Sequence, residues 1–179
     1  LLLVILLTKH YQRYYPKSMK EVISAIRNEV KTLNSLMISL SSEQWQSSTK
    51  FKDWTPEIII SHLYYFDLMT IYSLNKPGMF DQEAKFLLST YVEIRQSLPR
   101  AQKVLERLKT SNYQELMKGW LVANNLMCEV FEKTDPKERC KWFGPDMGAR
   151  MFMTARYMET WSHSQAIYDL ISIQRDYSD

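Results

Sequence analysis

The chain has 179 residues, of which 45% are hydrophobic and 24% are charged, a composition typical of a single folded domain with a substantial core. Residues 1–18 carry three of the 23 basic side chains and none of the 20 acidic ones, so the remainder has 20 basic against 20 acidic groups. This neutral body has no basic stripe, which argues against nucleic acid as a partner. The sequence has only four glycines and few β-branched runs, a composition that favours helices.

The first seven residues, LLLVILL, are apolar, but this run is too short to span a bilayer. It also lacks the charged start and the small-residue cleavage site of a signal peptide. We therefore expect residues 1–18 to be an N-terminal extension outside the fold, and we expect no association with a membrane. Cys128 and Cys140 lie in separate segments without a paired motif, which favours free thiols in a reducing, cytoplasmic compartment.

Two long helices are predicted in the first half of the chain. Apolar residues recur at intervals of three and four over residues 19–40, which indicates the first helix, and the polar segment 41–53 breaks the pattern. The tripeptide Thr55-Pro56-Glu57 then combines an N-cap, a proline at the first helical position and an acid in the first turn. This start predicts a second helix that ends at about residue 74.

The second half begins with a helical region over residues 80–110. We expect an interruption at Pro99, because the residue before a proline avoids helical geometry, and we interpret the region as a crossover with one or two shorter helices. A capping box over Ser111–Gln114 predicts a third long helix to about residue 131. After a loop with two prolines, a fourth is predicted over residues 147–173. The expected fold is therefore an all-α four-helix bundle with a long crossover between helices two and three.

Two of the three histidines fall on the inward faces of predicted long helices, His62 on the second and His163 on the last. Glu159 precedes His163 by one turn, so the two lie on one face about 6 Å apart along the axis. An ionised carboxylate inside a bundle is costly unless it is paired or bound to metal. Two imidazoles and a carboxylate make a three-ligand set suited to Zn²⁺ or another divalent first-row metal, with coordination positions left for water or substrate.

Other interpretations fit the same residues. Glu159 and His163 at this spacing also form surface pairs, and His62 equally fits a core histidine that donates to a backbone carbonyl. Arg156, one turn before Glu159, is a candidate catalytic residue that neutralises this carboxylate or holds an anionic substrate; alternatively, its stem lies along the bundle edge with its head in water. Aromatic residues near these positions in the sequence either line a pocket or pack in the core: Trp54, Trp142, Trp161, Tyr64, Tyr65 and Tyr157.

Two pairs of segments carry a family pattern. The first pair is Trp54-Thr55-Pro56 followed by SHLYYFD from Ser61. The second is WFGPDM from Trp142, leading into ARYMETWSH from Ala155. In residue types, order and separation, these segments resemble the motifs of the DinB-like, mycothiol-dependent maleylpyruvate isomerase superfamily. The resemblance covers about residues 19–175 and is greatest to a branch known mainly as uncharacterised metal-binding proteins.

The resemblance implies a DinB-like metal-binding four-helix bundle over residues 19–175. It also implies that a divalent metal, usually zinc, is held by His62, Glu159 and His163. Characterised relatives use the metal to bind and activate a low-molecular-weight thiol, such as mycothiol, bacillithiol or glutathione, for isomerase or S-transferase reactions on an electrophilic substrate. Two alternatives stay open: a non-catalytic bundle whose metal serves stability or partner binding, and a metal-assisted hydrolase that needs no thiol.

The sequence departs from the family pattern at two places. Relatives commonly carry an aspartate three residues after the last ligand, where this sequence has Ala166, so we expect a hydrogen-bond partner of the histidine to be lost or the pocket to be more open. Relatives also often continue into a smaller C-terminal domain, whereas this sequence stops at Asp179. If that domain recognises the substrate, the chain is expected to represent the metal-binding core alone.

Overall fold

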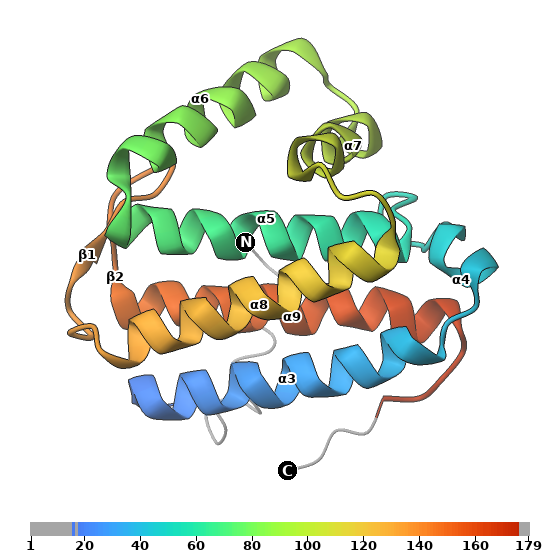
Figure 1. The fold of residues 1–179 in the computed structure, drawn as a ribbon, viewed down its shortest axis with the longest axis horizontal. Helices are drawn as coiled ribbons and strands as arrows, with labels where there is room; N and C mark the ends of the chain where they lie inside the picture. The colour runs from blue at the N-terminus through green and yellow to red at the C-terminus, as the bar shows by residue number, and fades with distance from the viewer. Residues whose placement is uncertain (1–15, 17, 176–179) are drawn as a thin grey trace, which may run out of the picture.

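A bundle of four long helices forms the body of the molecule (Figure 1). The computed structural model describes residue 16 and residues 18–175, so nearly all of the predicted N-terminal extension lies outside the described residues. The long helices are α3 (Met19–Ser39), α5 (Pro56–Asn75), α8 (Tyr113–Glu132) and α9 (Ala149–Leu170). Both α3 and α5 pack against α8 and α9, so α3 and α5 occupy opposite corners of the bundle. The prediction of an all-α four-helix bundle is confirmed.

Three of the long helices begin at a side chain that caps the first turn. Ser18, Thr55 and Asn112 accept hydrogen bonds from backbone N–H groups of α3, α5 and α8, respectively. The predicted start of the second helix at Thr55 is therefore confirmed. The cap of α8 lies one residue later than the predicted capping box, because Asn112 is the N-cap and Glu115 accepts from the N–H of Ser111.

The crossover consists of α6 (Pro77–Glu93) and α7 (Ser97–Leu108), which lie over the outer side of α5 (Figure 1). The predicted interruption at Pro99 is wrong, because the break falls at residues 94–96 and Pro99 lies in the first turn of α7. The N–H groups of a first turn have no partner within the helix, so a proline there loses no hydrogen bond.

A partly buried polar cluster joins this crossover to the bundle. Tyr65 of α5 donates to Oε2 of Glu83 on α6 over 2.7 Å. Arg107 of α7 donates to Oε1 of the same carboxylate over 2.8 Å. One carboxylate therefore ties α5, α6 and α7 together above a small apolar core that includes Met69 and Leu87.

Smaller elements occupy the polar segment after α3 and the predicted loop before α9. The polar segment 41–53 contains the short helix α4 (Ser42–Gln46), which starts with a capping box. The connection between α8 and α9 contains β1 (Arg139–Cys140), paired antiparallel with β2 (Met147–Gly148). This ribbon takes up the first two residues of the predicted fourth helix, so α9 begins at Ala149.

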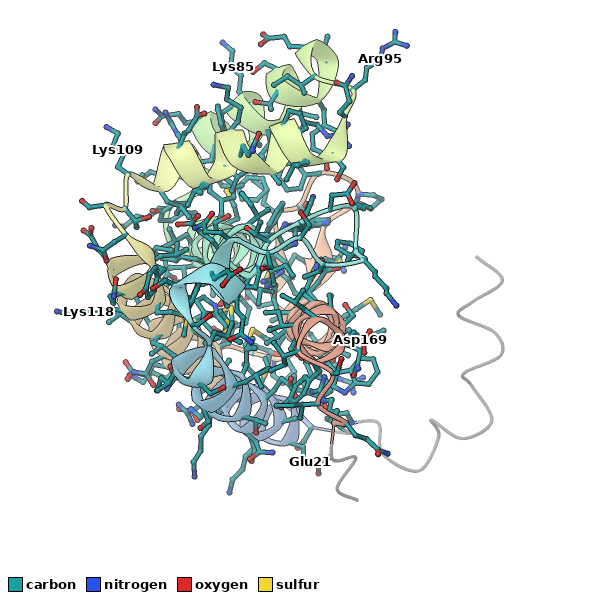
Figure 2. The ribbon with its side chains drawn as sticks, turned by 90° about the vertical axis from the view of Figure 1, so that its right-hand side faces the viewer. Glu21, Lys85, Arg95, Lys109, Lys118 and Asp169 are labelled. Carbon is teal, nitrogen blue, oxygen red and sulfur yellow. The ribbon has the colours of Figure 1, made fainter. Side chains whose placement is uncertain are left out.

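The helices pack closely around an apolar core. Gly119 shows how closely α8 approaches α5, because a Cβ at this position would lie 2.8 Å from a ring carbon of Tyr64. Viewed along the helices, the crossover covers one side of the bundle, and the labelled lysines Lys85, Lys109 and Lys118 point outward (Figure 2). Among the described residues, no helix combines the length and the apolar character needed to cross a bilayer.

Candidate metal centre

His62, Glu159 and His163 meet at one point between α5 and α9. The Nε2 atoms of His62 and His163 both lie 3.2 Å from Oε2 of Glu159. One ligand atom from each of the three residues lies within 4.8 Å of the others, a grouping that no other histidines, cysteines or acids in the described part of the chain form. The packing of α5 against α9 thus brings together the three residues that the sequence analysis singled out.

Two of the three separations between donor atoms in this cluster suit a zinc ion, and all three donor atoms lie within 4.8 Å of one another. In tetrahedral coordination with bonds of about 2.05 Å, neighbouring donor atoms are about 3.3 Å apart. The two separations of 3.2 Å between imidazole nitrogen and carboxylate oxygen are close to this value. Three protein ligands also leave a fourth position open for an exchangeable ligand.

The protonation states at neutral pH suit coordination. Burial lowers the pKa of His62 to about 4, and the nearby His163 and Arg156 contribute to this lowering, whereas the hydrogen bond to Glu159 opposes it. Hydrogen bonds from His163 and His62 hold the pKa of Glu159 well below its usual range, despite partial burial of the carboxylate. The imidazole of His62 is therefore neutral and the carboxylate ionised, as metal binding requires.

The three residues differ in their access to solvent. His163 is buried and His62 is half-buried, whereas the side chain of Glu159 is 47% exposed. The prediction that Glu159 lies on the buried face of the last helix is wrong, because that face of α9 passes through Arg156, Thr160 and His163. Glu159 lies at the edge of this face, where partial exposure of the carboxylate reduces the cost of burying its charge.

Aromatic rings hold the two imidazoles in place. The indole of Trp54 lies parallel to the ring of His163, with 5.7 Å between the ring centroids. Phe51 meets the same imidazole edge-on, and Phe66 lies 4.7 Å from the ring of His62. Contacts of this kind restrict the rotation of both histidines without using their Nε2 atoms.

A pocket of about 240 Å³ opens beside the cluster. Its wall is formed by α5 and α9, by the turn at Phe51–Trp54 and by the crossover helices α6 and α7. Of the six aromatic residues weighed from the sequence, Trp54 lines the pocket, while Tyr65 and Trp142 pack against neighbouring rings. Two basic residues in the wall, Lys52 and Arg100, carried no signal in the sequence, since neither belongs to a motif or a periodic face.

Arg156 lies outside this pocket wall. Its guanidinium is buried and donates to Oδ1 of Asp67 over 3.0 Å and to the carbonyl of Leu63. The other oxygen of Asp67 accepts from Trp120 and Asn124 of α8, over 3.0 and 2.8 Å. Arg156 is thus paired with Asp67, rather than with Glu159 or water. The catalytic role of Arg156 stays a prediction.

The chain matches the model of the mycothiol maleylpyruvate isomerase N-terminal domain over residues 26–168. Uncharacterised proteins from two strains of Mycobacterium tuberculosis are each 25% identical to it over 153 residues. The matched region covers 86% of this chain but 57% of the length of those relatives. No solved structure is significantly similar to the chain.

Proposed function

The chain belongs to the mycothiol maleylpyruvate isomerase N-terminal domain family, and from this premise we propose that it binds a divalent metal ion, zinc first of all, through His62, Glu159 and His163. The observation that carries this proposal is the convergence of two imidazole nitrogens on one carboxylate oxygen, at the spacing of metal ligands and beside a pocket. The reaction that best fits the family is a thiol-dependent transfer or isomerisation.

The residues of the site have distinct parts in this proposal. A bound divalent cation lowers the pKa of a coordinating thiol, so that the nucleophilic thiolate forms near neutral pH. The two histidines and Glu159 would hold the ion, and because all three line the pocket, the pocket would give the thiol access to it. Trp54 and Phe66 give the pocket an apolar wall that limits the access of water.

The size of the pocket restricts what it can enclose. Its 240 Å³ is below the ~300–1,000 Å³ of pockets that enclose drug-sized ligands. The pocket therefore takes a small electrophile together with the reactive end of a thiol such as mycothiol, bacillithiol or glutathione, while the rest of the thiol lies outside. A cytoplasmic location is part of the proposal, because Cys128 and Cys140 are both buried and unpaired.

Metal uptake tests the proposal directly. Elemental analysis of protein stripped with EDTA and titrated with Zn²⁺ is expected to show one ion per chain. The variants His62→Ala, Glu159→Gln and His163→Ala are each expected to weaken binding by more than about 100-fold, since the loss of even a ligand's hydrogen-bond partner costs 10–100-fold. Asp169→Asn is the matched control, because Asp169 is an exposed carboxylate on the same helix. No uptake by the wild type, or unchanged uptake by all three variants, rules out the site.

A second measurement separates the thiol-dependent reaction from its alternatives. Native mass spectrometry of protein taken from cell extract is expected to show the metal together with a retained thiol. Metal binding with turnover that survives complete removal of thiols would instead favour hydrolysis by bound water. Metal binding that raises the melting temperature, with neither thiol nor turnover, would favour the non-catalytic bundle.

A further inference from the structure

We propose that Lys52 and Arg100 form an anion-binding subsite in the pocket beside His62, Glu159 and His163. The ligand of this pocket is then a small molecule that carries a carboxylate. The inference deepens the proposed function and rests on it, because it defines the chemical class of the molecule that meets the metal. The carboxylate belongs either to the thiol or to its electrophilic partner.

The charges in the pocket wall favour an anion. Lys52 and Arg100 are the basic residues of the wall and Glu159 is its acidic residue. Glu159 is already engaged by the two histidines. Within the described part of the chain, neither Lys52 nor Arg100 forms an ion pair, whereas Arg107, Lys141 and four other basic residues do. With a divalent ion in place, the wall carries an excess of positive charge in a mostly apolar cavity, where an anion is strongly attracted.

A tight turn places Lys52 at the rim of the pocket. Lys52 and Asp53 have φ values of 53° and 59°, the left-handed conformation that residues other than glycine rarely adopt. The N–H of Trp54 closes this turn by donating to the carbonyl of Phe51 over 3.0 Å. The ammonium group of Lys52 then lies 5.0 Å from the ring centroid of Phe51 and 5.9 Å from that of Trp54. Strain of this kind is concentrated at functional sites, and here it fixes a cation beside the two rings that pack on His163.

Arg100 approaches the pocket from the crossover. Its guanidinium lies 4.2 Å from the ring centroid of Tyr91, which also lines the pocket, and makes one long contact of 3.4 Å to the carbonyl of Ile94. This leaves most of its five N–H donors for a ligand, in the fork geometry that matches a carboxylate. Arg100 also lies in the first turn of α7, which has no acidic residue and no side-chain cap, so the partial positive charge of the helix end has the same sign.

The size and lining of the pocket define the rest of the ligand. Apart from these charges, the wall includes Leu87, Ala101 and Val104, with the aromatic rings of Trp54 and Phe66. A short apolar segment between the reacting atom and the carboxylate therefore matches the lining of the pocket. A neutral ligand of the same size would leave both cations partly desolvated without a partner, which lowers its affinity.

Calorimetry with two thiols of similar size tests the subsite. Mercaptoacetate carries a carboxylate and 2-mercaptoethanol carries a hydroxyl in its place. Binding of each is measured to Zn²⁺-loaded and metal-free protein, with the metal content of every sample determined by elemental analysis. The variants are Lys52→Gln, Arg100→Gln and the charge-preserving Arg100→Lys. Lys103→Gln is the matched control, because Lys103 is exposed on the same helix and does not line the pocket.

The loaded wild type is expected to bind mercaptoacetate at least about tenfold more tightly than 2-mercaptoethanol. Lys52→Gln and Arg100→Gln are each expected to weaken the binding of mercaptoacetate by about tenfold. Both variants should bind 2-mercaptoethanol as tightly as the wild type and keep full metal content. Arg100→Lys is expected to retain part of the affinity, and Lys103→Gln all of it.

Equal affinities for the two thiols in the wild type would overturn the subsite. So would a preference for mercaptoacetate that persists in both glutamine variants, because chelation by the metal alone would then explain it. A wild type that takes up no metal overturns the proposed function instead. In that case, binding of mercaptoacetate that depends on Arg100 still supports the subsite, and its absence rejects the subsite too.

Competition with propionate, a carboxylate without a thiol, shows whether the carboxylate of the ligand belongs to the thiol or to its electrophilic partner. Competition by propionate against mercaptoacetate, with no loss of 2-mercaptoethanol binding, assigns the carboxylate to the electrophilic partner. Displacement of both thiols by propionate that is lost in Arg100→Gln assigns the subsite and the thiol position to one molecule, so the carboxylate belongs to the thiol. Displacement that persists in Arg100→Gln is coordination of propionate to the metal and contradicts the subsite. Failure of propionate to compete at all contradicts an anion subsite.

Discussion

The imidazole of His62 shows how the site sets the state of a single residue. Its pKa falls from 6.5 to about 4, mainly because the ring is removed from water, and the positive field of Arg156 acts in the same direction. Glu159 stays ionised because two histidines donate hydrogen bonds to it. These are the charge states that the proposed metal binding requires of the two residues, with the remaining proton of His62 moved from Nε2 to Nδ1.

This shift predicts how the stability of the metal-free protein depends on pH. Between pH 6.5 and about 4, the unfolded chain binds a proton at His62 that the folded chain does not, so stability falls as the pH falls through this window. The expected loss is up to about 3 kcal/mol. The lowered pKa of Glu159 extends the loss below pH 4.5, where the unfolded carboxylate is protonated first. Urea unfolding of EDTA-treated protein at about pH 7.5, 5.5 and 4.5 measures the effect.

The matched variant for this prediction is His62→Phe, which keeps an aromatic ring beside Phe66 and Trp54 but removes the titrating group. Its stability should change much less between pH 6.5 and 4.5 than that of the wild type. Identical pH profiles for the two proteins would show that His62 is not the origin of the slope.

At the scale of the elements, the crossover helices depend on their ends. The helix α7 starts without a side-chain cap and stops at Lys109, whose φ of 54° and ψ of 37° are left-handed. Glycine is the usual residue at such an end, because it adopts this conformation without steric cost. Lys109 therefore destabilises the end of α7 relative to a glycine at the same position.

Lys109→Gly is accordingly expected to stabilise the protein by about 0.5–1 kcal/mol. The same substitution at Lys118, an exposed position inside α8, should destabilise it by about 1 kcal/mol, because glycine is a poor helix former there. Denaturant unfolding of both variants gives the comparison. Destabilisation by Lys109→Gly similar to that of Lys118→Gly would contradict the left-handed end.

At the scale of the whole molecule, buried polar contacts fix how the long helices lie against one another. Arg156 of α9 and Asp67 of α5 form an ion pair that is 3% and 0% exposed, and Trp120 and Asn124 bring α8 into the same network. A second buried pair joins Arg175 to Glu29 of α3, and Arg175 also donates to Ser164 of α9. The first network lies one to two turns from the proposed metal ligands and so sets which faces of α5 and α9 meet.

Substitution of Arg156 tests whether this residue positions the helices or takes part in catalysis. Arg156→Met leaves the carboxylate of Asp67 buried without its cation and is expected to cost about 3–5 kcal/mol. The double variant Asp67→Asn with Arg156→Met removes both charges and keeps an oxygen that accepts from Trp120 and Asn124, so most of the stability should return. Unfolding by urea and Zn²⁺ titration of both variants are the measurements.

If Arg156 only positions the helices, the double variant should regain metal affinity and any thiol-dependent turnover together. A double variant that is stable and loaded with metal, yet inactive, would support the catalytic role predicted from the sequence. A stable single variant would show that the pair contributes little to the fold.

The local pattern of the sequence was sufficient for most of the secondary structure. Apolar spacing at three and four located α3, α5, α8 and α9, and the Thr55-Pro56 start marked the beginning of α5. The interruption predicted at Pro99 was wrong. The short helix α4 and the two-residue strands were not predicted, because elements this short leave no periodic signal. The three metal-ligand candidates were also available from the sequence, through the one-turn spacing of Glu159 and His163 and the family resemblance.

Only the tertiary structure decided how these residues are used. The rotation of α9 about its axis decides that Glu159 is exposed and that Arg156 pairs with Asp67. The path of the crossover decides that Lys52 and Arg100 line one pocket. Asp67 and Arg156 are 89 residues apart, and no local pattern records which of several polar partners a buried charge will meet. By itself, the sequence determined the helices and the donor atoms, because hydrogen bonding and apolar spacing act within a few residues. The tertiary structure determined the pocket and its charges, because these depend on packing between distant segments.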